Sequence, residues 1–437
     1  MSEGAEGAGT DSVIRDPGLA PGGLLKIEWV KSHMPVLAAI TAELLGFCAG
    51  PGSASGRQPL AGLRVAACLH LEAKTANLLL SLRDLGADVV ACGSNPLSTQ
   101  DDVVAALIGE PGIRVYAWHG ATPDEYHRFV GMAAATGPDI VIDDGADLIT
   151  TLHADYPDLA ARVRGGAEET TTGVIRLTAM AGDGALRFPV LAVNDTPMKR
   201  IFDNKYGTGQ SCWDGIMRCT NLSVAGKTVV VAGYGFCGRG VAMRAVGLGA
   251  RVIVVEVDPV AANEALMDGH AVMPMSAAAE AGDVFVTTTG CCDAVRGEHL
   301  ARIRDGALLA NAGHFNVEIN LAHLAALCKG PPRRVRANVD EYRTRAGRRL
   351  YLLGEGRLVN LAAADGHPTE VMDLSFALQA LAVLHIATGQ LDGLGGRVVR
   401  MPAALDRKVA ELRLASLGVE LERLTPAQQD YLRAWQV

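Results

Sequence analysis

The 437-residue chain has few aromatic side chains, with 8 Phe, 8 Tyr and 4 Trp, and its 9 cysteines contain no Cys-x-x-Cys pair. The missing spacing excludes a zinc ribbon and a thioredoxin-type redox site, so we expect no metal and interpret the cysteines as free thiols of a reducing cytoplasm. Positive charge is not in excess either, because 40 Lys and Arg stand against 48 Asp and Glu, a net charge of −8. This balance argues against a nucleic-acid partner or an anionic membrane surface.

The sequence also has no pattern of a secretion signal or a membrane span. The first 22 residues are mostly Gly, Ala, Ser, Pro and acids, without a basic start followed by an apolar run. The most apolar uncharged window, residues 374–391, is interrupted by Gln379, His385 and Gly389. We therefore expect a buried helix there, no membrane contact, and a cytoplasmic protein.

Apolar runs alternate with helical patterns in two successive series. The predicted strands cover residues 63–70, 88–93, 114–118 and 139–144 in the first series, and 227–235, 251–259, 283–290 and 307–313 in the second. Near-continuous apolar strands that alternate with helices are typical of parallel sheets covered on both faces. The sequence therefore predicts an α/β protein with two doubly wound, Rossmann-like domains.

A glycine-rich turn opens the second series. Gly233-Tyr-Gly235-Phe-Cys-Gly238 fits G-x-G-x-x-G, directly after a predicted strand and before a predicted helix. In this motif the first glycine makes the tight turn, the second lets the backbone approach a pyrophosphate, and the third packs the helix on the sheet. Glu256 ends the next strand, where a carboxylate accepts from both ribose hydroxyls and repels a 2′-phosphate. The motif predicts NAD rather than NADP.

Polar side chains with catalytic chemistry lie outside this turn. His70 and Asp144 each end a predicted strand, and Lys199, Asp203 and Asn204 lie within six positions of one another. Charged groups at the carboxyl ends of parallel strands are where open α/β sheets carry their ligand chemistry. An acid/base reaction is therefore expected beside the NAD site.

Seven segments together resemble the S-adenosylhomocysteine hydrolase family, over residues 26–432. They are STQDD (98–102), DDGADL (143–148), EETTTG (168–173), FDNKYG (202–207), AGYG (232–235), GHF (313–315) and EGRLVNLAAADGHP (355–368). The segment TGQS (208–211) and the His-x-Glu-x-Lys sequence that begins at His70 are similar to the shorter, archaeal-type branch. Many other members carry His-x-Thr-x-Glu there.

The resemblance implies reversible cleavage of the thioether bond of S-adenosyl-L-homocysteine or S-inosyl-L-homocysteine, giving homocysteine and a nucleoside. In that family, tightly held NAD oxidises the 3′-hydroxyl, a base removes the acidified 4′-hydrogen, the 5′ substituent is eliminated, water adds, and the ketone is reduced again. There is no net oxidation, so the cofactor stays bound. The family precedent also implies a homotetramer.

The resemblance carries roles over to individual residues. The implied catalytic residues are His70, Asp144, Lys199, Asp203, Asn204 and His314. Lys199 with Asp203 would handle the proton of the 3′-hydroxyl, and we expect a lysine buried beside a carboxylate to have the lowered or coupled pKa that a base needs. Asp144 would act at the 4′ carbon, and His70 would donate and accept the proton on the 5′ side.

Ligand-binding residues follow in the same way. Those implied for the substrate are Glu72, Lys74, Thr75, Glu169, Thr170 and His367. Those implied for the cofactor are Thr170, Thr171, Thr172, Asn204, Gly233, Gly235, Phe236, Gly238, Glu256, Thr288 and Asn360. Glu169 and Thr170 would bind ribose hydroxyls, whereas His314 and Asn360 would lie near the nicotinamide and the sugar.

Lys74 bears on the choice of purine. A lysine only donates hydrogen bonds, so at the purine 6-position it would match the 6-oxo group of hypoxanthine better than the amino group of adenine. Mismatching a buried donor costs about 1–3 kcal/mol. Two alternatives stay open, since Glu72 can accept from adenine and Lys74 can pair with Glu72 without facing the base.

Two departures from the family pattern leave other functions open. Asn316 stands where the family usually has Asp, and Leu378 stands where it usually has Asn. One alternative is an NAD-dependent nucleoside dehydratase that forms a 4′,5′-unsaturated nucleoside in an angustmycin-type antibiotic pathway. The other is an inactive, NAD-binding regulatory paralogue, against which the intact His70, Asp144 and Lys199 argue.

Domain limits follow from the two series and the resemblance. We predict a flexible leader (1–23), a split substrate-binding domain (24–207 and 368–401), an inserted NAD-binding Rossmann domain (208–367) and a short helical C-terminal segment (402–437). A helix over 24–45 and a linker over 50–59 begin the substrate domain, and a turn is expected near Pro426.

Overall fold

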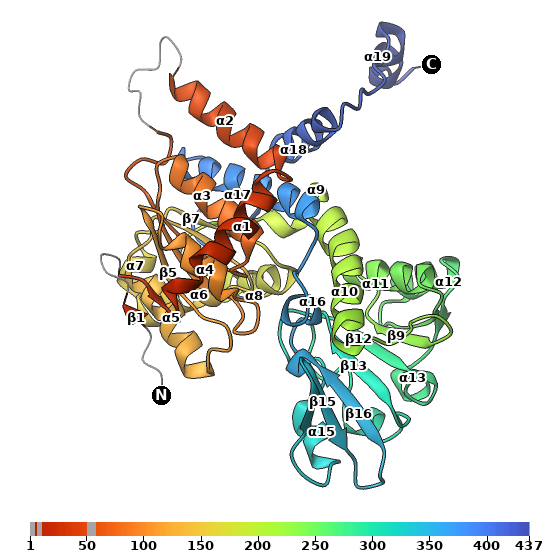
Figure 1. The fold of residues 1–437 in the computed structure, drawn as a ribbon. Helices are drawn as coiled ribbons and strands as arrows, with labels where there is room; N and C mark the ends of the chain where they lie inside the picture. The colour runs from red at the N-terminus through yellow and green to blue at the C-terminus, as the bar shows by residue number, and fades with distance from the viewer. Residues whose placement is uncertain (1–4, 7–10, 50–57, 437) are drawn as a thin grey trace.

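The computed structural model describes residues 5–6, 11–49 and 58–436, which form two helix-covered sheets (Figure 1). Among these residues the first sheet has, in spatial order, β1 (Ala5–Glu6), β2 (Val13–Ile14), β5 (Ile113–Tyr116), β4 (Asp88–Gly93), β3 (Arg64–Leu69), β6 (Ile140–Asp143), β7 (Gly165–Glu168), β8 (Val190–Ala192) and β17 (Val398–Arg400). From β2 to β17 every neighbouring pair is parallel.

The second sheet is built by the chain between β8 and β17. Its order is β11 (Ala271–Val272), β10 (Arg251–Val255), β9 (Thr228–Ala232), β12 (Val284–Thr287), β13 (Ala307–Asn311), β16 (Arg349–Leu353), β15 (Val339–Arg343) and β14 (Arg333–Arg336). The strands from β11 to β16 are parallel, whereas β15 pairs antiparallel with both of its neighbours. The expectation of a split domain with an inserted Rossmann-like domain is therefore confirmed.

Both sheets are buried on both faces, as the apolar strands predicted. In β3, Val65 and Ala67 pack into one hydrophobic cluster while Ala66 and Cys68 pack into another. Strand β9 divides its residues between two clusters in the same way. Because successive strand residues point to opposite faces, this division requires helices on each side of each sheet.

The helices alternate with the strands along the chain. The helices before the inserted domain are α1 (Ala20–Lys31), α2 (Pro35–Ala49), α3 (Ala73–Asp84), α4 (Asp101–Leu107), α5 (Pro123–Ala135), α6 (Asp147–Asp155), α7 (Pro157–Ala160), α8 (Thr171–Gly182) and α9 (Pro197–Lys199). Those of the inserted domain are α10 (Thr208–Thr220), α11 (Phe236–Gly247), α12 (Pro259–Met267), α13 (Met275–Ala281), α14 (Gly297–Leu300), α15 (Leu321–Ala326) and α16 (Val359–Ala362). The last three are α17 (Thr369–Ala387), α18 (Ala403–Ser416) and α19 (Pro426–Arg433).

The N-terminal region differs from its prediction. Val13 pairs with Tyr116 of β5, and Ile14 is only 1% exposed, so the expected leader is wrong from residue 13 onward. The single helix expected over 24–45 is two helices, because α1 ends at Lys31 and α2 starts with Pro35. Proline has no N–H to donate and therefore suits the first turn of a new helix. Most of the expected linker, residues 50–57, lies outside the described residues.

The C-terminal part contains the buried helix that the sequence predicted. Helix α17 has the length and apolar composition of a membrane span, but 72% of its most apolar window is buried inside the protein. Helices α18 and α19 follow, and α19 lies away from both sheets (Figure 1). Pro426 is the first residue of α19 rather than only a turn, with Thr425 as its N-cap. All eight cysteines that the structure describes are free thiols.

Candidate active site

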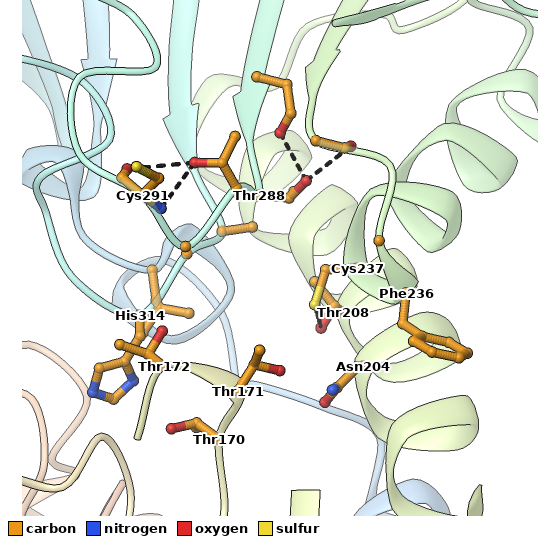
Figure 2. Close-up of a pocket in the computed structure, with 18 of the residues that line it drawn as sticks. Thr170, Thr171, Thr172, Asn204, Thr208, Phe236, Cys237, Thr288, Cys291 and His314 are labelled. Atoms are coloured by element: carbon orange, nitrogen blue, oxygen red, sulfur yellow. Dashed lines mark hydrogen bonds between the residues drawn. The ribbon is translucent and has the colours of Figure 1, made fainter. Parts of the chain in front are cut away.

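One large cavity, of about 1150 Å3, is lined by residues of both sheets and their connections (Figure 2). Every predicted site residue except Gly238 lines it. These are His70, Glu72, Lys74, Thr75, Asp144, Glu169, Thr170, Thr171, Thr172, Lys199, Asp203, Asn204, Gly233, Gly235, Phe236, Glu256, Thr288, His314, Asn360 and His367. Residues up to 297 positions apart in the sequence therefore meet around one space.

The glycine-rich turn has the geometry that the motif predicted. Gly233 follows β9 with a φ of +95°, which only glycine adopts readily. A Cβ at Gly238 would lie 2.0 Å from the carbonyl oxygen of Gly233, so the third glycine is required by close packing. Helix α11 begins at Phe236, and no side chain caps its first amides. Open amides at a helix N-terminus provide the donors and positive potential that a pyrophosphate needs.

Glu256 is fixed beside this turn. It follows β10, and its carboxylate accepts hydrogen bonds from the backbone N–H groups of Tyr234 at 2.6 Å and Val257 at 2.6 Å. It also accepts from the N–H of Asp258 at 3.0 Å. Since a carboxylate has about four lone-pair positions, about one remains for a ribose hydroxyl. The residues present in this half of the cavity therefore fit NAD.

Lys199 lies at the centre of a buried polar group. Its ammonium donates to Asn204 Oδ1 at 2.8 Å and lies 3.2 Å from Asp203 Oδ1 and 3.5 Å from Glu169 Oε1. Residues 200–207 form a π-helical segment, which turns Asp203 and Asn204 toward the lysine. Such π-bulges are rare and often occur at functional sites.

The charge state of Lys199 differs from our expectation. Burial disfavours its ammonium, but Asp203 and Glu169 outweigh burial and raise the pKa of Lys199 above its ordinary value. We expected a lowered or coupled pKa, and the lowered alternative is wrong, because two carboxylates and not one surround the lysine. Burial acts to raise the pKa of Asp203, but Lys199, His367 and Ser375 together outweigh burial, so this pKa is lowered. In contrast, burial raises the pKa of Glu169 to about 7.

Helix α17 contributes two polar residues that the sequence analysis missed. Ser375 donates to Asp203 Oδ2 at 2.8 Å, and Gln379 donates to Glu169 Oε2. They are four positions apart, so they lie on the same face of the helix. The sequence did contain a sign of this role, because two polar residues four positions apart stand out in an otherwise apolar helix.

Other polar residues of the cavity were also missed. Asn194 accepts from Asn204 at 3.0 Å and donates to Thr171 at 3.1 Å, so it joins the lysine group to the threonine turn. Thr208 and Cys237 line the same region, as Figure 2 shows. The sequence motifs that contain these residues were identified, but which side chains they contact depends on the tertiary structure.

His70, Asp144 and His314 form a second group in the cavity. Asp144 lies 3.2 Å from Nε2 of His70 and 3.4 Å from Nδ1 of His314, and one polar atom of each side chain lies within 4.8 Å of the others. Burial lowers the pKa of His70 to about 4, against the effect of Asp144. Nδ1 of His70 contacts Ser98 Oγ at 2.8 Å, and that hydroxyl donates to Asn95 O. Nε2 of His70 faces Asp144, so the two side chains can share one proton.

Lys74 is paired with Glu72, one of the two alternatives that the sequence left open. Its ammonium lies 2.8 Å from Glu72 Oε2 and donates to the backbone oxygen of Asp365 at 2.7 Å. Both side chains still line the cavity. Because an ammonium has three donors, one remains for a ligand.

The two departures from the family pattern lie outside the cavity lining. Leu378 is fully buried in the hydrophobic core beside the first sheet. Asn316 is partly buried next to Gly356 and is absent from the cavity wall. Neither substitution removes a group from the site, so neither favours the dehydratase or the inactive paralogue.

Two family models match the chain. The model described as S-adenosyl-L-homocysteine hydrolase matches residues 11–156, and the one described as S-adenosyl-L-homocysteine hydrolase, NAD binding domain, matches residues 204–366. The chain belongs to the S-adenosyl-L-homocysteine hydrolase family. Its inserted domain is accordingly an NAD-binding domain, as the glycine-rich turn predicted.

Relatives of this family match nearly the whole chain. The S-inosyl-L-homocysteine hydrolase of Methanopyrus kandleri is 54% identical over 423 residues, which cover 97% of each chain. The adenosylhomocysteinase of Pyrococcus abyssi is 54% identical over 430 residues, 98% of each chain. The adenosylhomocysteinase of Aquifex aeolicus is 51% identical over 424 residues, 97% of this chain and 99% of the relative.

Proposed function

We propose that the chain catalyses the reversible, NAD-dependent hydrolysis of S-adenosyl-L-homocysteine or S-inosyl-L-homocysteine to homocysteine and a nucleoside. The observation that carries this proposal is one cavity that joins the NAD turn to the Lys199 and Asp144 groups. Enzymes with these two activities are among the most similar relatives. A simple dehydrogenase would need only one of the two acid/base groups.

Buried atoms without partners support a polar, hydroxyl-rich ligand. Among the described residues, the buried cavity-lining atoms without a hydrogen bond belong to Asp144, Glu169, His314 and Asn360. Three of these atoms are oxygens that accept hydrogen bonds, and those of Asp144 and Glu169 have ion-pair contacts only. Leaving such atoms unpaired is costly, so they fit a ligand that brings donors, as ribose hydroxyls and a carboxamide do.

When bound, NAD supplies the reversible oxidation of the sugar at its 3′ carbon. We assign the 3′-hydroxyl to Lys199 and Asp203: the ammonium holds the oxygen, and the ionised carboxylate receives its proton. Asn204 fixes the ammonium through the 2.8 Å hydrogen bond. Glu169 accepts a hydrogen bond from a ribose hydroxyl and thereby positions the sugar next to Lys199 and Asp203.

The second group serves the 4′ and 5′ carbons. Asp144 removes the 4′ proton, and His70 moves the proton at the 5′ position through Nε2. The 3.2 Å contact between the two side chains lets one proton pass between them. His314 contacts the other carboxylate oxygen of Asp144 and belongs to the cofactor domain, so it would lie between this group and a bound cofactor.

The choice of purine is part of the proposal. The third donor of Lys74 suits the 6-oxo group of hypoxanthine, while the Glu72 carboxylate, already paired with that ammonium, is the weaker acceptor for an amino group. Relatives of both specificities share about the same identity with this chain, so the residues alone carry this argument. We propose hypoxanthine as the preferred base.

We further propose that the protein is a homotetramer and that it is cytoplasmic. From residue 24 onward, we also propose the domain limits given above. Exposed apolar side chains near the C-terminus support association, because such surface is usually covered by a partner. They include Leu417, Leu421, Leu424, Leu432 and Trp435. Mass measurement of the intact protein under native conditions tests the oligomeric state.

The decisive experiment incubates purified protein with each thioether and with adenosine or inosine alone, and identifies the products by mass. Release of homocysteine is the expected result. If both thioethers remain intact while bound NAD is present, the proposed hydrolysis is wrong.

A further inference from the structure

The turn that carries Asp144 has an unfavourable backbone conformation. Gly145 has a φ of +96° and Ala146, which is not glycine, has a φ of +66°. Consecutive left-handed residues are uncommon and persist only where the surroundings hold them. Asp143 fixes the two ends of this turn, because its carboxylate accepts from the N–H groups of Asp144 at 3.0 Å and Ile149 at 2.7 Å. The Gly145 backbone between them is held by other parts of the chain.

Two side chains from the β7–α8 unit grip the backbone of Gly145. Its N–H donates to Glu168 Oε1 at 2.9 Å, and its carbonyl oxygen accepts from a guanidinium N–H of Arg176. Glu168 ends β7 and is completely buried, and Arg176 lies on α8. Arg176 is itself held by Asp147, whose Oδ1 lies 2.7 Å from the same nitrogen.

We propose that Glu168 and Arg176, here called the Gly145 clamp, are positioning residues that aim the Asp144 carboxylate at the reacting 4′ carbon. The proposal rests on the proposed function, because it assigns Asp144 to that carbon. Neither clamp residue lines the cavity. They therefore act through the turn and not by touching the substrate.

The clamp also connects Asp144 to the rest of the site. Glu168 Oε1 accepts from the N–H of Thr170 at 3.0 Å and from its hydroxyl at 2.9 Å, so one oxygen fixes both the Asp144 turn and the turn next to Glu169. A Cβ at Gly173 would lie 2.1 Å from the Glu168 carboxyl group, so glycine is needed there to admit it.

Arg176 extends the clamp to the cofactor domain. Its guanidinium lies over the ring of Phe315 at 5.5 Å, and that ring packs edge-on against His314 at 4.5 Å. A Cβ at Gly145 would lie 2.2 Å from Nε2 of His314. The clamped turn is thus the point where the substrate side meets the His314 segment.

The test compares Arg176→Met, which removes both hydrogen bonds, with Arg176→Lys, which keeps a cationic donor group, in the NAD-loaded protein. Because the Arg176 side chain is 35% exposed, we expect both variants to fold. In Arg176→Met, kcat and the exchange of the 4′-hydrogen of bound nucleoside with D2O should both fall roughly tenfold or more, since small misplacements of a catalytic group have such effects. KM and NAD content should change less than about twofold, and Arg176→Lys should recover part of the loss.

A matched control is Arg187→Met, because Arg187 also donates to a backbone oxygen, that of Pro157, but lies away from the cavity. Its kcat and exchange rate should equal those of the wild type. Unchanged exchange in Arg176→Met, or a loss of NAD as large as the loss of kcat, would overturn the clamp. Wild-type release of homocysteine reports separately on the proposed function.

A second pair decides the question if Arg176→Met does not fold. Glu168→Gln keeps an acceptor oxygen for Gly145 and Thr170, whereas Glu168→Ala has none. The clamp requires that the glutamine variant retain 4′-hydrogen exchange and that the alanine variant lose it. Equal exchange in the two variants overturns the proposal.

Discussion

Lys199 has the densest set of charge contacts in the active site. Two carboxylates and one amide oxygen surround its ammonium within 3.5 Å, whereas burial alone would have lowered its pKa. The residue pattern identified these side chains but could not give their charges. Charge in a buried group depends on how many partners the fold brings together, and Glu169 arrives from a segment 30 positions away.

We predict that Lys199→Ala keeps bound NAD but loses its reduction by nucleoside at least roughly 10²-fold, because no group then holds the 3′-oxygen. Absorbance of the reduced nicotinamide after adding nucleoside measures the effect. Lys329→Ala is the control, since Lys329 is exposed and away from the cavity. Unchanged reduction in Lys199→Ala would remove this residue from the mechanism.

Glu169 predicts a pH dependence of nucleoside binding. Burial raises its pKa to about 7, so its carboxylate is mostly protonated below that pH and ionised above it. Only the ionised form offers all its oxygen lone pairs to ribose hydroxyls, so KM should fall by about tenfold as the pH rises through 7. Glu169→Gln should make KM independent of pH in this range. A flat wild-type profile between pH 6 and 8 would contradict the assignment.

Among the elements, long apolar strands were predictable and short polar ones were not. Strands β3 and β9 are buried hydrophobic runs and were expected, whereas β7, with the sequence GGAE, has no strand signal of its own. It is a strand because β6 and β8 pair with it on both sides. The π-helical segment 200–207 likewise depends on packing, since FDNKYG has no local pattern that distinguishes it from an ordinary helix.

Helix α17 fixes the start of α2 through Asp373. The carboxylate accepts from the N–H groups of Val36 at 2.9 Å and Leu37 at 2.8 Å, which have no other partner in the first turn of a helix. Asp373→Ala should therefore lower the free energy of unfolding by about 1–3 kcal/mol. Urea unfolding measures this, with Glu370→Ala, an exposed acid on the same helix, as the control. Equal stability of the two variants would show that the cap contributes nothing.

At the scale of the whole molecule, both domains contribute to the proposed site for the base. Lys74 belongs to α3, yet its ammonium also donates to Asp365 at the end of the inserted domain. The two series of strands predicted the two domains from the sequence. Contacts of this kind could not be predicted, because they depend on how the two domains pack together.

Lys74→Glu should shift the preference toward adenosine over inosine by roughly tenfold, because a carboxylate accepts from an amino group and repels a 6-oxo group. The ratio of the two kcat/KM values, measured in one protein preparation, gives the shift. Since Lys31 is exposed and far from the cavity, Lys31→Glu controls for the change in net charge. An unchanged ratio of kcat/KM values would show that Lys74 does not determine which purine base is preferred.

The inserted domain is joined to the first sheet by two stretches of chain, one after β8 and one before β17. The first contains Lys199, Asp203 and Asn204, and the second contains His367 and Ser375. Both stretches therefore carry residues of the proposed active site. For protein engineering, this means that the domain cannot be exchanged freely, because replacing it by another nucleotide-binding unit at its natural junctions would divide the proposed active site.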